Sequence, residues 1–284
     1  MSAALADLVA LLDLERLEVN HFRGHSLDGN NRVRIFGGQV AGQALVAAGR
    51  TVPADRFVHS LHAYFLRPGD PKVPVLYVVD RIRDGRSFTT RRSVGVQHGE
   101  AIFHLSASFQ QPEEGPEHQD PMPAAPDPES LPTFAERFAP YAEALGEWYT
   151  RPRPIDTRYT APLQRGREPG PPSQQVWFRA DGVLPDDPLL HACVLAYASD
   201  MTLLDSVLLP HGIRWTDEEF MGASLDHAMW FHRPFRTDRW LLYDQASPSA
   251  TGARGLGRGE IFDDEGRLVV SVVQEGLVRR IRSH

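Results

Sequence analysis

Two stretches of this sequence are near copies of each other, Ser60-Leu-His-Ala-Tyr-Phe-Leu-Arg-Pro68 and Ser224-Leu-Asp-His-Ala-Met-Trp-Phe-His-Arg-Pro234. When their Arg-Pro ends are aligned, 166 residues apart, Phe65 falls on Phe231. The repeat is too long for a solenoid, whose units span roughly 20–50 residues. The sequence therefore predicts one fold used twice, which leaves one copy free to carry chemistry and the other to act as scaffold.

Length and composition are those of a globular protein. With 284 residues, 42% of them hydrophobic, the chain can form two modest domains that share a core. The net charge of −7 argues against nucleic acid as a partner, and the single Cys193 suggests a reducing compartment. The sequence has no basic, apolar leader and no apolar run of the roughly 18 residues needed to span a bilayer. We therefore expect no membrane insertion and a cytoplasmic location.

Hydrophobic patterning predicts a similar order of elements in both halves. The first half is expected to hold helices over 4–14 and 39–50 and strands over 17–21, 32–36, 57–66, 73–83, 87–97 and 101–110. The second half is expected to hold a strand over 176–180, a helix over 191–209 and strands over 223–232, 239–247, 253–263 and 267–278. The helices over 39–50 and 191–209 are apolar on most faces, which indicates that both are buried.

These elements predict an α+β fold, a double hotdog in which two fused antiparallel sheets each wrap around one long buried helix. The N-terminal hotdog is expected over 1–110 and the C-terminal hotdog over 174–284. Residues 111–173 hold 14 of the 23 prolines, which block helices and ladder hydrogen bonds. We expect this segment to be a linker on the surface, with one short helix over 133–147.

Three polar residues of the second half stand in apolar surroundings. Asp200 is expected inside the helix over 191–209, Ser224 opens the repeated strand, and Gln274 lies in the last strand. An acid in an apolar helix is costly unless it is paired, so Asp200 has either a structural or a chemical purpose. A buried cap or salt bridge would explain Asp200 equally well, and satisfied strand polar groups would explain the other two.

Common catalytic and metal-binding motifs are absent. The chain has no Gly-x-Ser-x-Gly elbow, no phosphate-binding glycine loop followed by lysine and no His-Glu-x-x-His. His227 and His232 flank Trp230, but a spacing of five does not bring them together on a strand or a helix. We therefore expect no metal site.

Several long motifs resemble the acyl-CoA thioesterase II (TesB-type) family. They begin at Arg34, Val58, Arg83, Tyr197, Asp226 and Val273, and read RIFGGQVAGQAL, VHSLHAYFLRPGD, RDGRSF, YASD, DHAMWFHRP and VQEG. The resemblance runs from about residue 15 to 279. It implies a double hotdog that hydrolyses fatty acyl-CoA to free acid and CoA, with Asp200, Ser224 and Gln274 of the second hotdog as the catalytic set.

The chemistry of a thioester suggests how this set would work. We expect Asp200 to take a proton from water while Ser224 and Gln274 orient that water, because a nucleophilic serine would need an adjacent base such as histidine. Backbone N–H groups of Gly38 and Gln39 at a helix start are candidate oxyanion donors. A strand-to-helix turn explains the glycines equally well. His59 is a candidate auxiliary contact or a core histidine.

The remaining expectations concern ligands and assembly. Arg86 and Ser87 could hold the phosphates or adenine of CoA, or could belong to a hairpin with an exposed arginine. No cofactor is expected, since CoA is part of the substrate. Hotdog sheets expose edges, which favours a homodimer or homotetramer.

Two other functions remain open from sequence. A hotdog enoyl-CoA hydratase or dehydratase normally pairs an aspartate with a histidine a few residues later, whereas no histidine follows Asp200 before His211. A non-catalytic acyl-CoA-binding protein would not need the intact trio. We expect a thioester hydrolase.

Overall fold

The computed structural model describes residues 1–26, 33–163, 168–215 and 217–281. Its first part contains α1 (Ala3–Leu12), β1 (Glu15–Glu18), β2 (His21–Gly24), α2 (Gly37–Gly49), β3 (Phe57–Phe65), β4 (Val75–Asp84), β5 (Phe88–Gln97) and β6 (Glu100–Gln110). The middle contains η1 (Pro128–Ser130), α3 (Phe134–Phe138), η2 (Ala139–Tyr141), α4 (Ala142–Leu145), α5 (Glu147–Thr150) and β7 (Ile155–Tyr159). The last part contains β8 (Ser173–Ala180), α6 (Pro188–Ser199), α7 (Asp205–Leu208), η3 (Leu209–His211), β9 (Phe220–Ser224), β10 (Asp226–Phe231), β11 (Leu241–Thr251), β12 (Arg254–Asp263) and β13 (Leu268–Arg280).

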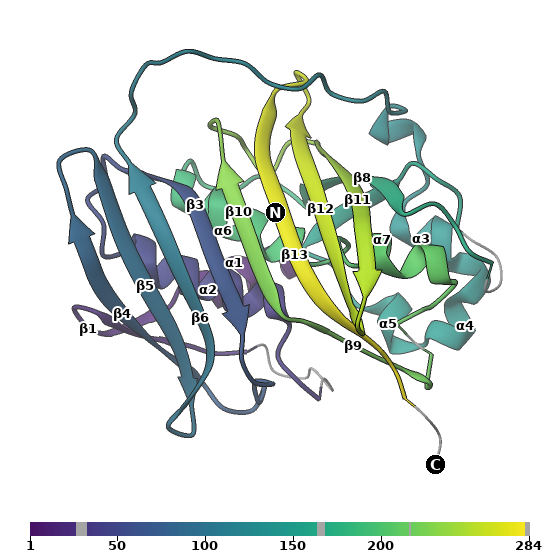
Figure 1. The fold of residues 1–284 in the computed structure, drawn as a ribbon, viewed down its shortest axis with the longest axis horizontal. Coiled ribbons are helices and arrows are strands. Elements are labelled where there is room, and N and C mark those ends of the chain that lie inside the picture. Colours follow the sequence, from purple (N-terminus) through teal and green to yellow (C-terminus); the bar gives the residue numbers. More distant parts are fainter. Residues whose placement is uncertain (27–32, 164–167, 216, 282–284) are drawn as a thin grey trace.

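The fold is a double hotdog whose strands form one antiparallel sheet. The order is β1-β2-β4-β5-β6-β3-β10-β13-β12-β11-β8-β7, and β9 pairs with the far end of β13. The two repeated tracts form the central strands β3 and β10, which pair with each other, Leu61 opposite Met229. The repeat in the sequence is therefore the seam of the fold, and backbone hydrogen bonds fuse the two predicted sheets into one (Figure 1).

The long helices α2 and α6 pack against each other behind this sheet (Figure 1). Small residues let their backbones approach closely. A Cβ added at Gly42 would lie 3.1 Å from the Cys193 carbonyl oxygen, and one at Gly38 would lie 2.4 Å from that of Tyr197. The N-terminal end of α2 therefore lies against the C-terminal end of α6.

The predicted helix over 191–209 is wrong in its extent. Helix α6 ends at Ser199, and Asp200 is its C-terminal cap rather than an interior residue. The following turn is held by side chains, because Thr202 accepts a hydrogen bond from Gln245 Nε2 at 2.6 Å. Local polar bonding of this kind competes with helix continuation, and the helical path resumes only at Asp205.

The predicted strand over 32–36 is also absent where it is described. Arg32 lies outside the described residues, and Phe36 is the extended N-cap of α2. Ile35 N–H donates to the Gly69 carbonyl at 2.9 Å in an isolated contact. Ile35 is buried in the loop before α2 while Val33 is exposed, so the apolar alternation there does not form a ladder.

The proline-rich segment is more structured than a plain linker. It crosses the upper edge of the sheet in Figure 1, and its strand β7 pairs with β8 to complete the second half of the sheet. The predicted helix over 133–147 is replaced by the short pieces from α3 to α5. Pro140 and the left-handed Gly146 (φ 50°) interrupt it. None of the described helices combines the length and apolar character needed to cross a bilayer.

Candidate active site

Asp200 lies where the end of α6 meets the start of α2. Asp187 caps the other end of α6 through the amides of Leu189 and Leu190, and Pro188 occupies its first turn, so the helix is well defined from its start. Its apolar run packs into the core and ends at the carboxylate of Asp200. The residue as a whole is half-buried, and its carboxyl group is buried where the two helices meet.

Ser224 and Gln274 come to this carboxylate from two paired strands. Gln274 Nε2 donates to Asp200 Oδ1 at 2.6 Å and to Ser224 Oγ at 2.9 Å. Ser224 Oγ in turn donates to Asp200 Oδ1 at 3.2 Å. The structure thus brings the predicted trio into one closed ring of hydrogen bonds, in which Gln274 is fully buried and Ser224 half-buried.

The surroundings raise the pKa of Asp200 to about 6. Burial is the main cause, because it disfavours the charged carboxylate, and hydrogen bonds from Gln274, Ser224 and the Gly38 backbone oppose it. The carboxyl therefore changes its charge close to neutral pH. A carboxylate with such a pKa is a stronger base than an ordinary surface aspartate.

The start of α2 closes the site on its other side. A Cβ built on Gly37 would lie 2.7 Å from Asp200 Oδ2 and 2.9 Å from the Phe65 ring, so only glycine leaves room there. The Gly38 amide is directed toward the carboxylate. The Gln39 amide donates to the Phe36 carbonyl at 3.1 Å, and its side chain donates to Ser26 Oγ at 3.0 Å. Of the two predicted oxyanion donors, Gly38 reaches the site while Gln39 is occupied elsewhere.

His59 is not brought to the trio. It lies at the other end of β3, about seven residues or roughly 23 Å along the strand from the position next to Ser224. Its Nε2 contacts Ser108 Oγ at 2.7 Å, its ring packs on Phe88, and burial lowers its pKa. These contacts describe a half-buried histidine bonded within the sheet, and a role of His59 in substrate contact stays a prediction.

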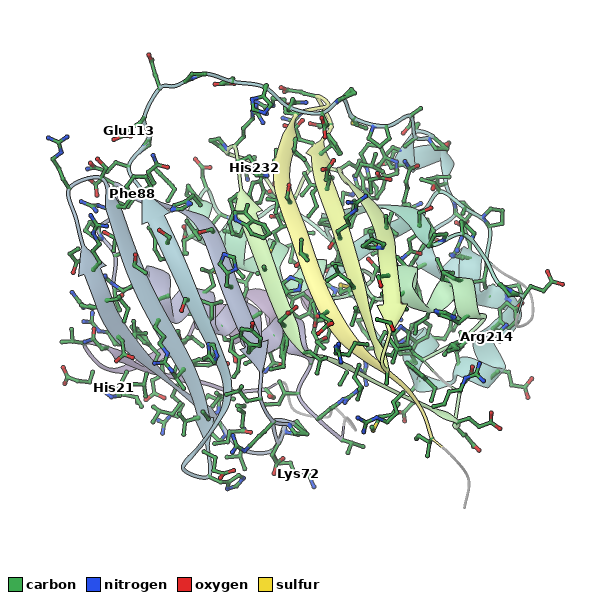
Figure 2. The ribbon with its side chains drawn as sticks, in the orientation of Figure 1. His21, Lys72, Phe88, Glu113, Arg214 and His232 are labelled. Carbon is green, nitrogen blue, oxygen red and sulfur yellow. The ribbon has the colours of Figure 1, made fainter. Side chains whose placement is uncertain are left out.

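Arg86 and Ser87 form the hairpin between β4 and β5, also far from the trio. Phe88 beside this hairpin and Lys72 lie at opposite ends of the strands in Figure 2, and the start of α2 is on the side of Lys72. Arg86 is exposed, and its carbonyl accepts from Arg56 at 2.8 Å. The structure therefore shows the hairpin with an exposed arginine, and the role in CoA binding stays a prediction.

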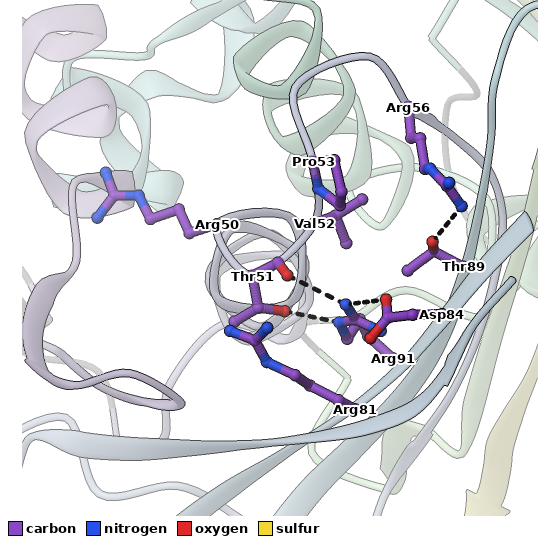
Figure 3. A pocket seen from close by; sticks show the side chains of 9 residues that line it. All are labelled: Arg50, Thr51, Val52, Pro53, Arg56, Arg81, Asp84, Thr89 and Arg91. Carbon is purple, nitrogen blue, oxygen red and sulfur yellow. Dashed lines mark hydrogen bonds and ion pairs between the residues drawn. The ribbon is translucent and has the colours of Figure 1, made fainter. Parts of the chain in front are cut away.

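A pocket of about 370 Å³ lies near this hairpin, at the C-terminal end of α2 (Figure 3). Arginines line it, but they are bonded to the protein itself. Buried Arg91 donates to Asp84, at 2.6 Å, and to Thr51, and Arg56 donates to Thr89 Oγ1 at 2.6 Å. Its lining does not include the trio, and we regard it as a structural feature of the scaffold.

Sequence reasoning considered His227 only as a metal ligand and missed its actual position. It is completely buried on β10, and its Nε2 contacts Ser199 Oγ at 2.9 Å. Burial lowers its pKa to about 4. The signal was available in the strand alternation, since His227 and Met229 share the inward face of β10. Among the described residues, no group of three or more histidine, cysteine, aspartate or glutamate side chains could hold a metal ion.

Comparisons with known proteins identify the family and support the fold. A model of the family described as "Acyl-CoA thioesterase N-terminal domain" matches residues 27–110, and one described as "Acyl-CoA thioesterase" matches residues 150–277. Human acyl-coenzyme A thioesterase 8 is 43% identical over 292 residues, which cover 96% of this chain and 88% of the relative. Acyl-CoA thioesterase 2 of Haemophilus influenzae is 40% identical over 285 residues, covering 98% and 99% of the two chains.

Similar solved structures support the same fold and family. The structure of a protein with a hot dog fold from Alicyclobacillus acidocaldarius, 20% identical, aligns with a TM-score of 0.79 over 99% of this chain and 100% of that one, and places this chain in the hotdog class. The acyl-CoA thioesterase II TesB2 from Mycobacterium marinum aligns with a TM-score of 0.81 and 49% identity, covering 98% and 99% of the two chains. Our chain belongs to the acyl-CoA thioesterase family and is a thioester hydrolase.

Proposed function

We propose that this protein hydrolyses fatty acyl-CoA by attack of a water molecule that Asp200 activates. The observation that carries the proposal is the ring of hydrogen bonds among Asp200, Ser224 and Gln274. The ring bonds Oδ1 of Asp200 and leaves Oδ2 outside its bonds. The names of the relatives support an acyl-CoA substrate.

In this scheme Asp200 is the general base. Its pKa of about 6 makes it mostly ionised at neutral pH and yet basic enough to accept a proton from attacking water. A positioned general base contributes on the order of 10²–10⁴ in rate. Ser224 and Gln274 hold one oxygen of the carboxylate in place, so that the other faces the water.

Direct nucleophilic attack by Ser224 has less support. Its hydroxyl contacts Asp200 and Gln274, whereas a serine nucleophile generally works with a histidine or lysine base. The positive end of the α2 dipole lies beside the site at Gly38, where it would favour negative charge on the carbonyl oxygen of the thioester. The CoA thiolate is a good leaving group, and thioester hydrolysis needs no redox change. We therefore propose a reaction without a further cofactor.

We also propose a homodimer or homotetramer in the cytoplasm. The sheet ends in β1 and β7, and all four residues of β1 are exposed, so a second chain could continue the ladder there. The cytoplasmic location remains a prediction from the sequence.

A hydratase or dehydratase is the second candidate, because it shares the fold. A GphF dehydratase variant aligns at a TM-score of 0.52 and 16% identity, a likeness that speaks for fold alone. His227, which lies beside Gln274, is completely buried, with its Nε2 turned to Ser199. This placement disfavours direct proton transfer between His227 and a bound substrate. A non-catalytic acyl-CoA-binding protein is the third candidate.

The test is release of free CoA from acyl-CoA of several chain lengths, followed with a thiol reagent. We expect the wild type to release thiol and Asp200→Asn to fold but lose about 100-fold or more in kcat, since the base is gone. Binding without thiol release would indicate a non-catalytic protein, and loss of a double bond without thiol release would indicate a hydratase. Full activity of Asp200→Asn would exclude the water scheme, and an acyl group trapped on Ser224 would favour covalent catalysis.

A further inference from the structure

A buried histidine lies directly behind the amide of Gln274. The pairing of β10 with β13 places Ala228 opposite Val273, and His227 and Gln274 directly adjoin this pair on the two strands. The two side chains contact each other, since Gln274 acts on the pKa of His227 through a side-chain hydrogen bond. Both side chains are completely buried, and both point from the sheet toward α6 and its end.

Each of these two side chains has one polar atom that lacks a well-formed hydrogen bond. These atoms are His227 Nδ1 and Gln274 Oε1, and their other polar atoms are bonded. A buried polar atom without a partner costs about 1–3 kcal/mol. The two atoms can satisfy each other, because a protonated Nδ1 is a donor and an amide oxygen is an acceptor. The raising effect of Gln274 on the pKa of His227 has the sign that such a contact produces.

Building on the proposed function, we propose that His227 is a positioning residue for the reaction: its Nδ1–H holds the Gln274 amide with Nε2 turned to Asp200 and Ser224, and Ser199 fixes the histidine in that tautomer. A series of hydrogen bonds, each with one donor and one acceptor, then links Ser199, His227, Gln274 and Asp200.

The charge of Asp200 decides which atom is the donor in each hydrogen bond of this series. An ionised carboxylate only accepts, so Gln274 must present Nε2 to it at 2.6 Å, and a flipped amide would place two oxygens in repulsive contact. With Nε2 fixed there, Oε1 faces His227 and requires a proton on Nδ1. The neutral imidazole then has a bare Nε2, which accepts from Ser199 Oγ at 2.9 Å. Burial lowers the pKa of His227 to about 4, so the ring is neutral at pH 7.

The first half of the fold supports a role tied to this one site. In the repeat alignment Leu61 occupies the position of His227, and its partner across the ladder is Ala107, in the position of Gln274. Both are buried, so the scaffold needs only apolar side chains at these places. In this proposal the second half has the hydrogen-bonded pair His227 and Gln274 at the place where the first half has the apolar pair Leu61 and Ala107.

Three variants at His227 separate positioning from packing. In His227→Asn the amide nitrogen takes the place of Nδ1, whereas in His227→Gln it takes the place of Nε2, and His227→Leu has no donor. We expect His227→Leu and His227→Gln to lose roughly 10- to 100-fold in kcat, with KM changed by less than about twofold. His227→Asn should stay within about fivefold of the wild type, because it restores the donor to Gln274.

His232→Leu is the matched control. His232 follows β10 on the face of the sheet opposite to that of His227, where it is exposed. It contacts Ser271 Oγ at 2.9 Å, the same kind of bond that His227 makes with Ser199. We expect its activity to equal that of the wild type. Normal kcat in His227→Leu, or equal loss in all three His227 variants, would overturn the proposal.

Nitrogen NMR of the histidine rings gives a readout that needs neither substrate nor a destabilised variant. Comparison of the wild type with His227→Asn identifies the His227 signals. We expect a neutral ring protonated at Nδ1, and protonation at Nε2 instead would refute the inference. This result is independent of catalysis: an inactive wild type would refute the proposed function, whereas an active wild type with the other tautomer would refute only the role of His227.

Discussion

Two opposing influences act on the carboxylate of Asp200, because hydrogen-bond donors contact one of its oxygens while the group as a whole is buried. The donors keep the carboxylate ionised, and burial works against them. The balance places the pKa in the range where a base is both available and effective. This balance is a property of three side chains and one backbone amide, and the loss of any one of them shifts it.

The pH profile of kcat/KM should report this balance. We expect activity to rise with pH through an inflection near 6, since only ionised Asp200 can accept a proton, and to fall about tenfold per unit well below it. Loss of thioester absorbance measures the rate across this range. Ser224→Ala removes a donor that favours the ionised form, so its inflection should lie at higher pH. An inflection that stays in place would show that Ser224 does not bond to the base.

At this scale the sequence could identify the residue types but not their partners. Resemblance singled out Asp200, Ser224 and Gln274, and the structure brings them together. His59 and Arg86 were plausible by type, yet strand register places both at the far end of the sheet. Register depends on pairing across the whole sheet, so motif reading alone could not place these two residues.

The start of α2 is the element that limits the shape of the site. Gly37 is tolerated there because it has no side chain, and the helix can then approach both Phe65 and the carboxylate. We expect Gly37→Ala to lower kcat/KM by about 10-fold or more, because the added methyl pushes on Asp200 Oδ2 and the misplaced base acts less well. Steady-state kinetics would measure the fall in kcat/KM, and unfolding in urea would measure any accompanying change in stability.

Gly115→Ala is the control for this change. A Cβ at Gly115 meets nothing within 4 Å, so activity and the urea midpoint should match the wild type. Unaltered kinetics in Gly37→Ala would mean that α2 can shift away and that its start does not set the position of Asp200.

Among the elements, strands were more predictable than helix ends. Alternation predicts β3 to β6 within two residues, because one face of the sheet packs on α2. The end of α6 was missed, since residues 200–205 remain apolar enough to read as helix while Thr202 bonds to Gln245. Strand β7 was missed because its neighbours are rich in proline, and its pairing with β8 is a tertiary contact.

For the whole molecule, the site reduces stability. Folding raises the pKa of Asp200 from an ordinary value near 3.9 to about 6, so the folded state binds this proton more tightly than the unfolded state. The free energy of unfolding therefore falls as pH rises from about 4 to 6. Asp200→Asn lacks this titration and should be more stable than the wild type by about 3 kcal/mol above pH 6.5.

Urea unfolding at pH 5.0 and pH 7.5 would test this expectation. The gain in stability of Asp200→Asn should be larger at the higher pH, where the wild-type carboxyl is ionised in its buried site. An equal gain at both pH values would indicate that lost packing or hydrogen bonds, rather than charge, decide the effect.

The pairing of β3 with β10 has a consequence for stoichiometry. Two separate hotdogs related by a twofold axis would present two equivalent catalytic centres. Here the positions in the first half that match Asp200, Ser224 and Gln274 are Arg50, Val58 and Ala107, from the helix caps and the repeat register. A tight inhibitor that mimics the reaction intermediate should therefore titrate one equivalent per polypeptide, however many chains associate.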